Sequence, residues 1–560
     1  MRIEDSRRLT GFNLMSPRAG AICEVRFQAE EEVEACLRAW SEALDQAFSL
    51  LSWGEIPRWV RRYEDMASLL FDAPLDALYA ATEINEWAVS RAKGEAPRAE
   101  AMLSAWQEAL SKEANPRLLA LESEAARRGL PFVWDDDFVS LGTGKTSKVW
   151  PTSALPESED VAWDALAAIP LAYITGTNGK TTSTRMTARI MEASGKTPGS
   201  TSSDGVVVAR EHIERGDWTG TGAARRVLRH PEVEVALLET ARGGMLRRGL
   251  VSPVSNAALI TNVASDHLGE YGISTVADMA EVKWLVAQSV RPSGQCVLNA
   301  DDPFLAPLGQ QSGARISWFT LEQPLPWLKA HVEAGGEAWV LEEGWLCMCR
   351  GKERFEVIAL HELPSAYGGA ARHNIANALG AAALSHSLGA PLEAVREGLL
   401  TFGASADDNP GRCQFQEVGG AQLILDFGHN PHGVKAMLSM ARRLMAERSG
   451  ARLWVSVGQA GDRSDEDLTD LAQVILDAAP DMVSLREILG YERGRASGEA
   501  ASIMRDALVR SGRSFDAIRM HEDEVSAMRD ALSWASPGDL IVHLVHIQRD
   551  ALGEFLAHWQ

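Results

Sequence analysis

The 560-residue sequence has no long apolar run, few cysteines and no excess of basic residues. A membrane-spanning helix needs about 20 consecutive apolar residues, and no such run occurs. The first residues, MRIEDSRRLTGF, also lack the apolar segment and small-residue cleavage site of a secretory signal. We therefore expect a cytoplasmic protein that is neither exported nor membrane-spanning.

The six cysteines are scattered, at positions 23, 36, 296, 347, 349 and 413. Sparse cysteine is typical of a reducing compartment and not of a disulfide framework. Cys347 and Cys349 form a lone CxC, without the second pair that a tetrahedral zinc site needs. We expect these two residues to be buried or strand-borne and not to bind zinc.

The net charge of −22 argues against a nucleic-acid partner, because such binding requires a surface rich in Lys and Arg. Two short basic segments are still candidate pockets for anionic groups. They are RRVLRH, residues 225–230, and ARGGMLRRGL, residues 241–250. For the first, solvated charge beside a strand is an equally good interpretation.

Length and pattern predict three domains, at residues 1–160, 166–408 and 409–560. Residues from about 29 to 128 have helical spacing, which predicts an α-rich (α+β) N-terminal domain. After a segment rich in Pro, Ser and acidic residues, short apolar runs alternate with amphipathic helices. This order predicts an α/β domain with a parallel sheet, and the block from Gly411 onward predicts a second, Rossmann-like α/β domain.

A glycine-rich turn joins an apolar run to a helical stretch in LAYITGTNGKTTSTRMTARIMEASG, residues 171–195. Backbone N–H groups of such a turn bind phosphates, a lysine adds charge, and a hydroxyl reaches Mg²⁺. The loop is a variant, since Ile174 stands where the strict pattern has its first glycine. We predict that ATP and Mg²⁺ bind at Gly176, Thr177, Asn178, Gly179, Lys180, Thr181 and Thr182.

Another GKT tripeptide, residues 144–146, serves as a comparison. Pro151 comes soon after it, and no amphipathic helix begins at Lys145. We do not expect this second tripeptide to bind phosphate.

Together with the rest of the chain after it, the loop resembles the Mur ligases and most closely the Mur-like half of cyanophycin synthetases. The matching stretches run in order from Leu171 to the C-terminus and include STSSDGVVV, GDWTGTGAARRVL, LLETARGGMLRRGL, TNVASDHLGEYGI, EVKWLV, VLNADDP, ARHNIANALGAAA, NPGR, ILDFGHNPHG, QAGDRSDED, GRASGE and SPGDLIV. The resemblance implies an ATP-dependent ligase that activates a carboxylate as an acyl phosphate and couples it to an amine.

The resemblance also implies roles for single residues. Thr181 and Glu239 hold a first Mg²⁺, and His267 helps to hold a second. Lys283 matches a lysine that many Mur ligases carbamylate to bind that second metal; an ordinary surface lysine in an ion pair is the alternative. Asn374 and Asn377 match residues that face the nucleotide base. Arg412, Asp426 and His429 match the ATP-facing edge of the last domain. The expected catalytic set is Lys180, His267, Lys283, Arg412 and His429.

The first 150 residues are also similar to cyanophycin synthetases, through RRLTGFNLMSPRAGAICEVRF and FVSLGTGKTSKVW. In that family an ATP-grasp domain follows the second of these segments. In this chain the segment is followed after a short stretch by the Mur-type phosphate loop, with no ATP-grasp domain between them. The resemblance then implies that this chain lacks the ATP-grasp chemistry that extends a peptide backbone, which leaves at most the Mur-type ligation. We expect the N-terminal domain to present substrate or build a homo-oligomer, a simple packing module being the alternative.

The expected partners are a small-molecule or peptide carboxylate and an amino acid, with arginine or another basic amino acid as first choice. A catalytically silent nucleotide-binding assembly protein of the same fold is the main alternative. A mechanical or transport ATPase is disfavoured, since the sequence shows no arginine finger for it.

Overall fold

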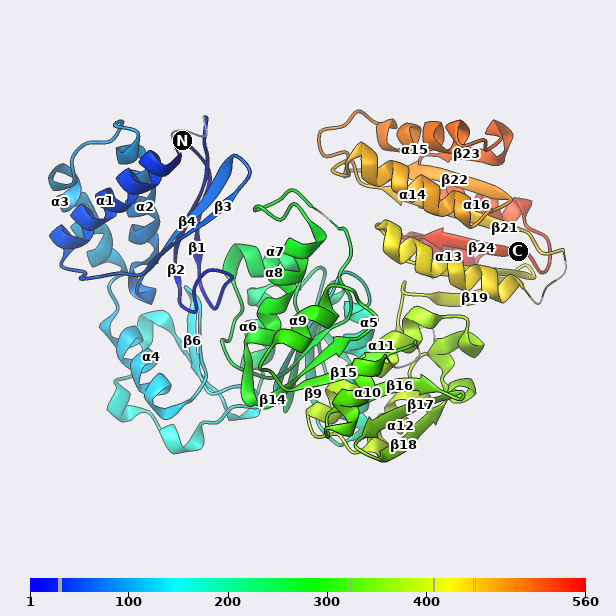
Figure 1. Ribbon diagram of the computed structural model, residues 1–560, viewed down its shortest axis with the longest axis horizontal. Helices are drawn as coiled ribbons and strands as arrows, with labels where there is room; N and C mark the ends of the chain where they lie inside the picture. Colours follow the sequence, from blue (N-terminus) through cyan, green and yellow to red (C-terminus); the bar gives the residue numbers. More distant parts are fainter. Residues whose placement is uncertain are drawn as a thin grey trace.

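A computed structural model describes residues 1–28, 33–266, 268–322, 325–405, 408–446, 448 and 450–559. Three parts succeed one another along the chain in Figure 1, from the blue N-terminal part through the green central part to the yellow-to-red C-terminal part. Within the described ranges, no helix combines the length and apolar character needed to cross a membrane.

The N-terminal part contains a four-stranded antiparallel sheet with the order β1-β2-β4-β3. Its strands are β1 Arg2–Leu9, β2 Gly20–Arg26, β3 Arg58–Tyr63 and β4 Met66–Asp72. Its helices are α1 Val33–Leu51, α2 Leu78–Ala92 and α3 Ala99–Glu113. The expectation of helical structure was wrong for residues 58–72. There the apolar run of β4 forms a strand between β2 and β3 and is buried on both faces of the sheet. Burial on both faces favours a strand over an amphipathic helix in this segment.

A buried amide fastens the helices to this sheet. The indole N–H of Trp40 on α1 donates to Asn85 Oδ1 on α2 at 2.9 Å. Asn85 Nδ2 in turn donates to the carbonyls of Ala21 and Leu69 on the sheet, at 3.0 and 2.9 Å. The Asn85 amide thus links α1 and α2 to the sheet, and its buried N–H and C=O groups have hydrogen-bond partners.

A small unit links the N-terminal and central parts. It contains α4 Pro116–Arg128 and a three-stranded sheet of β5 Phe132–Trp134, β6 Phe138–Leu141 and β7 Lys148–Pro151. The second GKT tripeptide lies between β6 and β7, and a strand comes after it instead of a helix. Lys145 Nζ there forms an ion pair with Glu234 Oε1 at 2.5 Å.

The central part is built on an eleven-stranded sheet with the order β11-β10-β9-β12-β8-β13-β14-β15-β16-β17-β18. The strands from β9 to β16 in this order are parallel, as the βαβ pattern predicts. Their bounds are β8 Leu171–Thr175, β9 Pro198–Ser202, β10 Gly205–Val208, β11 Glu211–Arg215, β12 Val235–Glu239, β13 Ser255–Ile260, β14 Val290–Asn299, β15 Ile316–Thr320, β16 Glu337–Glu342, β17 Trp345–Arg350 and β18 Glu353–Ala359.

Helices cover both faces of the central sheet. On one face lie α5 Lys180–Ala193, α11 Arg372–Ser387 and α12 Leu392–Thr401. On the other lie α6 Thr221–Arg229, α7 Arg242–Arg248, α8 Val276–Gln288, α9 Leu305–Gln311 and α10 Pro326–Glu333. Cys347 and Cys349 lie on β17, so the CxC is strand-borne as predicted. The described residues contain no group of three or more His, Cys, Asp or Glu side chains that could hold a metal ion.

The C-terminal part has a six-stranded sheet with the order β19-β20-β24-β21-β22-β23, in which only β19 is antiparallel. Its strands are β19 Gln414–Val418, β20 Ala421–Asp426, β21 Leu453–Gln459, β22 Met482–Glu487, β23 Ile518–His521 and β24 Leu540–Leu544. Its helices are α13 Pro431–Met445, α14 Asp465–Asp477, α15 Glu499–Arg510, α16 Glu524–Trp534 and α17 Arg549–Ala557.

Polar side chains cross the core of this last sheet. His543 on β24 stands beside Ser456 on β21, which stands beside Ser484 on β22. Both ring nitrogens of His543 are buried, with no hydrogen-bond partner among the described residues. Burial, reinforced by the nearby Arg486 charge, lowers the pKa of His543 well below the ordinary histidine value, so the folded protein keeps this ring neutral.

We expect acid to destabilise the protein through His543. The folded pKa is lowered, so its contribution to the unfolding free energy is complete above about pH 6.5 and declines by about 1.4 kcal/mol per pH unit below it. Denaturant unfolding at pH 7.5 and 5.5 should show a smaller acid loss in His543→Gln than in the wild type. His361→Gln, at an exposed position, should change nothing; equal acid losses in wild type and His543→Gln would contradict the assignment.

Candidate functional site

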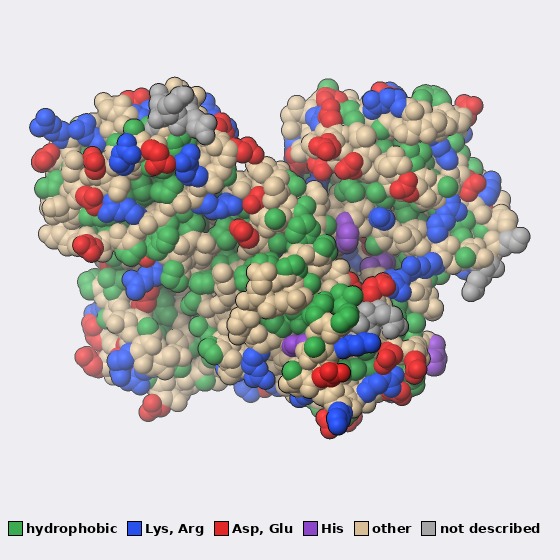
Figure 2. Space-filling view, in the orientation of Figure 1, with side chains coloured by type: hydrophobic (Ala, Val, Ile, Leu, Met, Phe, Trp, Pro, Cys, Tyr) green, Lys and Arg blue, Asp and Glu red, His purple; other side chains and the backbone are tan. Residues whose placement is uncertain are grey.

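A cavity of about 1530 Å³ lies between the central and C-terminal parts. In Figure 2 the surface is hollowed between these parts, and histidine side chains show there. Fourteen of the predicted site residues line the cavity: Gly176, Thr177, Asn178, Gly179, Lys180, Thr181, Thr182, Glu239, Lys283, Asn374, Asn377, Arg412, Asp426 and His429. His267, the remaining predicted residue, lies outside the described residues.

The phosphate loop joins β8, in the middle of the central sheet, to α5. Gly176 and Gly179 have φ angles of 149° and 83°, which disfavour other residues. A Cβ on Gly176 would lie 1.9 Å from Thr261 Oγ1, and a Cβ on Gly179 would lie 2.2 Å from Asn377 Oδ1. The loop therefore needs glycine at both positions to fit between β13 and α11.

Lys180 lies at the first position of α5 and folds back over the loop. Its Nζ donates to the carbonyls of Gly176 and Thr177 at 3.0 and 2.9 Å. The hydroxyl oxygens of Thr181 and Ser203 are 3.2 Å apart, and Thr182 Oγ1 accepts a hydrogen bond from Asn409 at 3.1 Å. This arrangement concentrates N–H groups, one ammonium and hydroxyls at a helix N-terminus, which suits a polyphosphate.

Glu239 ends β12, the strand beside β8, and its side chain is buried. Burial raises the pKa of this carboxyl, while the charges of Lys180 and Arg412 act in the opposite direction. Its Oε2 is buried without a hydrogen-bond partner among the described residues. A buried carboxylate oxygen with spare acceptor capacity, beside the Thr181 hydroxyl, is the donor set that Mg²⁺ prefers.

Lys283 lies on α8 and is buried. Burial, together with the nearby positive charge of Lys180, lowers the pKa of Lys283 to about 7. A surface lysine in an ion pair, the alternative interpretation, does not fit this burial. The structure places the amine at the cavity, where a neutral fraction exists near pH 7.

Asn374 and Asn377 lie on the first turns of α11 and are also buried. Asn374 Nδ2 donates to the Ser365 carbonyl at 3.1 Å, and Asn377 Nδ2 donates to Asn374 Oδ1 at 3.4 Å. Since Asn377 Oδ1 also abuts Gly179, these amides pack against the phosphate loop and are not solvated surface groups.

Three predicted residues approach the cavity from the C-terminal part. Arg412 Nη2 donates to Ser203 Oγ at 2.9 Å, and its guanidinium lies 4.3 Å from the center of the Phe427 ring. Asp426 accepts hydrogen bonds from the backbone N–H groups of Cys413 and Gly428, at 2.8 and 2.7 Å. His429 Nε2 lies 3.5 Å from Asp266 Oδ2. The two halves of the site thus contact each other directly.

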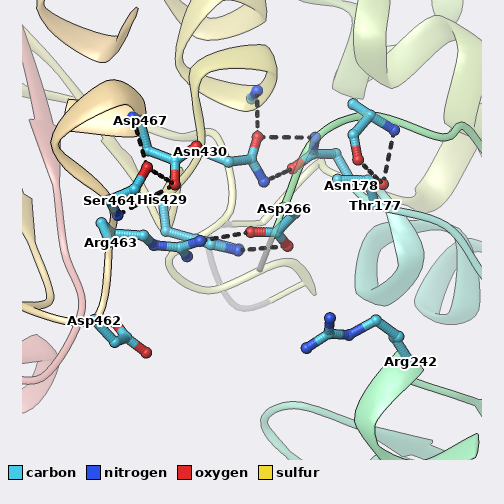
Figure 3. Close-up of polar contacts among 12 residues, drawn as sticks. Thr177, Asn178, Arg242, Asp266, His429, Asn430, Asp462, Arg463, Ser464 and Asp467 are labelled. Atoms are coloured by element: carbon cyan, nitrogen blue, oxygen red, sulfur yellow. Dashed lines mark hydrogen bonds and ion pairs between the residues drawn. The ribbon is translucent and has the colours of Figure 1, made fainter. Parts of the chain in front are cut away.

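Figure 3 shows further contacts across the cavity that the sequence reasoning did not single out. Asn178 and Asn430 exchange reciprocal amide hydrogen bonds, both 3.1 Å long. Arg463 Nη1 donates to Asp266 Oδ1 at 2.9 Å. Arg242 and Asp462 face the open space from opposite sides. The motifs GHNPHG, QAGDRSDED and ASDHLG contain most of these residues, but sequence alone does not show that they meet.

Asp204 forms another bridge between the two parts. Its carboxylate accepts from Arg185 on α5 at 2.8 Å and from Arg549 on α17 at 3.0 Å. Burial alone would raise the pKa of Asp204, but the charges of Arg185, Arg412 and Arg549 outweigh it and lower the pKa. Asp204 therefore stays ionised between three arginines.

The two basic segments have different surroundings. Arg229 Nη1 lies 2.5 Å from Asp135 Oδ2 and also donates to the Phe138 carbonyl through Nη2 at 2.9 Å. The segment of residues 225–230 therefore fastens the small linking unit, which neither interpretation anticipated. In the segment of residues 241–250, Arg242 lines the cavity, while the carbonyl of Arg248 accepts from the N–H of Thr10 at 3.1 Å.

Comparison with known proteins agrees with this architecture. Residues 174–385 match the Mur ligase middle domain, and residues 411–544 match the Mur ligase, glutamate ligase domain. The chain belongs to the Mur ligase family. Its central and C-terminal parts are therefore Mur ligase domains, as the resemblance of the sequence implied.

Cyanophycin synthetase of Synechocystis sp. is 37% identical over 376 residues, which cover 67% of this chain and 42% of that protein. The chain thus spans about two fifths of the length of such relatives. UDP-N-acetylmuramate–L-alanine ligase of Chromobacterium violaceum is 27% identical over 66% of this chain and 72% of that protein. The fold is similar to bifunctional folylpolyglutamate synthase/dihydrofolate synthase from Yersinia pestis, with a TM-score of 0.50 and 21% identity over 69% of this chain and 88% of the other.

We expect Asp204→Ala to loosen the contact between the Mur ligase domains, because Arg185 and Arg549 lose their common acceptor. Loss of charged hydrogen bonds should lower the unfolding free energy by about 2 kcal/mol. Hydrogen–deuterium exchange should also quicken in α17. Glu356→Ala, which removes an ion pair with Arg354 at the exposed start of β18, is the control. Equal effects of the two substitutions would show that Asp204 is no bridge.

Proposed function

We propose that the chain is an ATP-dependent carboxylate–amine ligase that forms ADP. The observation that supports this most is the meeting of the phosphate loop with Glu239, whose buried Oε2 has an open acceptor position, in one cavity closed by a second domain. A ligase of this type must bring a carboxylate and a triphosphate together, which requires cations and exclusion of water.

The reaction has two balanced steps. An oxygen of the substrate carboxylate attacks the γ-phosphorus of ATP, and the bond to the β-phosphate oxygen breaks, giving an acyl phosphate and ADP. The amine nitrogen then attacks the acyl carbon and loses a proton, and inorganic phosphate leaves. The acyl phosphate is sensitive to water, so domain closure protects it.

Cationic groups from three parts of the chain would meet the phosphates and the acid substrate. The Lys180 ammonium and the loop N–H groups neutralise the phosphates. Arg412 extends from the C-terminal domain to Ser203 and adds a second cation once the domains meet. Arg242 lines the same cavity from α7 and is positioned to bind a carboxylate of the acid substrate.

Among the described residues, Thr181 and Glu239 fit one Mg²⁺ as ligands. From the family resemblance we also propose His267 and Lys283 as ligands of a second. The metal would neutralise phosphate charge. The Yersinia pestis synthase was crystallised in complex with AMPPNP and Mn ion. Carbamylation of Lys283 belongs to this proposal, and its lowered pKa supports it because a neutral amine is the nucleophile.

For substrates we propose a side-chain or peptide carboxylate and a basic amino acid, arginine first. The 37% sequence identity to the cyanophycin synthetase of Synechocystis sp. supports this choice of substrates. The proposed homo-oligomer can be checked by light scattering.

Substrate-dependent release of ADP and phosphate tests the ligase. Purified protein with ATP and Mg²⁺ should respond to a pair of acid and amine, such as a short aspartate peptide with arginine, and mass spectrometry should find the amide. Free aspartate and arginine without primer should yield no polymer. Nucleotide binding without turnover across a broad panel would favour the silent assembly protein.

Lys180→Ala should lower the rate of ligation by about 10²–10³, because the phosphates lose their main side-chain cation. The melting temperature should stay close to that of the wild type. Lys145→Ala, in the other GKT tripeptide, is the matched control and should retain full activity. Full activity of a folded Lys180→Ala protein would place the active site elsewhere.

Glu239→Gln should raise the Mg²⁺ concentration needed for half-maximal nucleotide binding at least about tenfold, since an amide oxygen is a weaker ligand than a carboxylate. Titration with Mg²⁺ and a fluorescent ATP analogue measures this. Glu234→Gln, one residue before the same strand and paired with Lys145, should leave the titration unchanged. An unaltered Mg²⁺ requirement in Glu239→Gln would remove Glu239 from the metal site.

A further inference from the structure

The N-terminal sheet contacts one loop of the central domain, residues 268–275, here called the docked loop. Arg61 on β3 donates through Nη1 to the Tyr271 carbonyl and through Nη2 to the Gly272 carbonyl, both at 3.0 Å. The Tyr63 ring lies so close to Gly272 that a Cβ there would be 2.3 Å from it. Ser274 Oγ donates to Glu64 Oε1 at 2.9 Å. One strand of the N-terminal domain thus runs along the loop.

A buried carboxylate organises this contact from behind. Glu24 on β2 accepts from Arg7 at 2.8 Å, from the Tyr63 hydroxyl at 2.6 Å and from Ser68 Oγ at 2.6 Å. The Arg7 guanidinium lies 4.6 Å from the center of the Tyr271 ring, and its Nη2 donates to the Leu246 carbonyl on α7 at 3.1 Å. Arg7 therefore touches both the docked loop and α7.

The docked loop has a strained backbone. Gly269, Tyr271 and Gly272 have φ angles of 96°, 52° and 69°. A bulky side chain such as that of Tyr271 is rare in the left-handed region and persists where surrounding contacts impose it. The contacts from Arg61 and Arg7 fall on this residue and its neighbour. The N-terminal domain thus supplies contacts that hold this conformation, in addition to the loop's own hydrogen bonds from the Gly269 N–H to the Ile273 carbonyl and from the Ile273 N–H to the Glu270 carbonyl.

Asp266, just before the docked loop, and Glu270, within it, both line the cavity of the ligase site. Asp266, two residues before it, accepts from Arg463 of the C-terminal domain. Glu270 within it forms an ion pair with Arg242, which lines the cavity. The loop leads directly into α8, which carries the buried Lys283.

We propose that the N-terminal sheet is a positioning element of the ligase site, with Arg61 as its central positioning residue. By holding the docked loop, it aligns Glu270 with Arg242 and Asp266 with Arg463, so that the acid substrate and the closing domain meet a preformed edge. This inference rests on the proposed ligase function. It gives the domain a role beyond substrate presentation, and the phosphate loop itself is not part of it.

Arg61→Ala in the full chain tests the inference, with Arg62→Ala as the matched control. Arg62 is the next residue of β3, is exposed and pairs with Glu34 within the N-terminal domain. Hydrogen–deuterium exchange needs no substrate, so its result is separate from the success of the ligase assay. Exchange should quicken at least about tenfold in residues 268–275, and also in residues 460–465 around Arg463, in Arg61→Ala only. Unchanged exchange in the docked loop would overturn the proposal.

Kinetics supply the second measurement once an acid and amine pair is found. Arg61→Ala should lower kcat about 10–100-fold, with the affinity for ATP within about twofold of the wild type because the phosphate loop is untouched. Arg61→Lys, which keeps the charge and a donor, should recover part of the rate. Wild-type kcat in Arg61→Ala would show that the loop contact is mere packing, and a parallel loss of ATP affinity would show general damage to the fold.

Discussion

The close approach of the phosphate loop to its neighbours is the constraint on which the site depends. Gly176 and Gly179 are held against Thr261 and Asn377 with no room for a Cβ. Because the residue directly after β13 and a residue of α11 are these neighbours, the loop can be formed only when the sheet and its covering helix are both in place. The fold thereby sets the direction of the loop N–H groups before any phosphate arrives, which is what preorganised electrostatic stabilisation requires.

The position of the phosphate loop also sets which charges surround Glu239. Burying Glu239 beside the loop is costly, and the pKa of its carboxyl is raised by that burial. Lys180 and Arg412 offset part of the cost, but Arg412 comes from the C-terminal domain. Asp204 in turn holds arginines of both domains. Contact between the domains is therefore coupled to the charge of the site, and it is made by polar groups, which exchange readily with water.

Much of this could be predicted from the sequence. Alternating apolar runs and helices indicate the parallel sheet, and the glycines, lysine and threonines indicate the phosphate loop. Strands β3 and β4 could not be predicted, since MASLLFD forms a strand through pairing with β2, far away in the sequence, and RWVRRY forms one through pairing with β4. The contacts of Asn178 with Asn430 and of Asp204 with Arg549 also join distant segments, and no local pattern encodes them.

The arginines of the two basic segments explain where the N-terminal domain sits. Arg225 and Arg229 face the small linking unit, and Arg248 faces β1 and the segment after it. These three arginines therefore bind segments of the same chain, and Arg248 also lines the cavity together with Arg242 of its own segment. The first basic segment therefore contacts the small linking unit, and the second both contacts the N-terminal part and lines the cavity. The N-terminal sheet lies against α7 and the docked loop, so this edge of the cavity is supported from outside the Mur ligase domains.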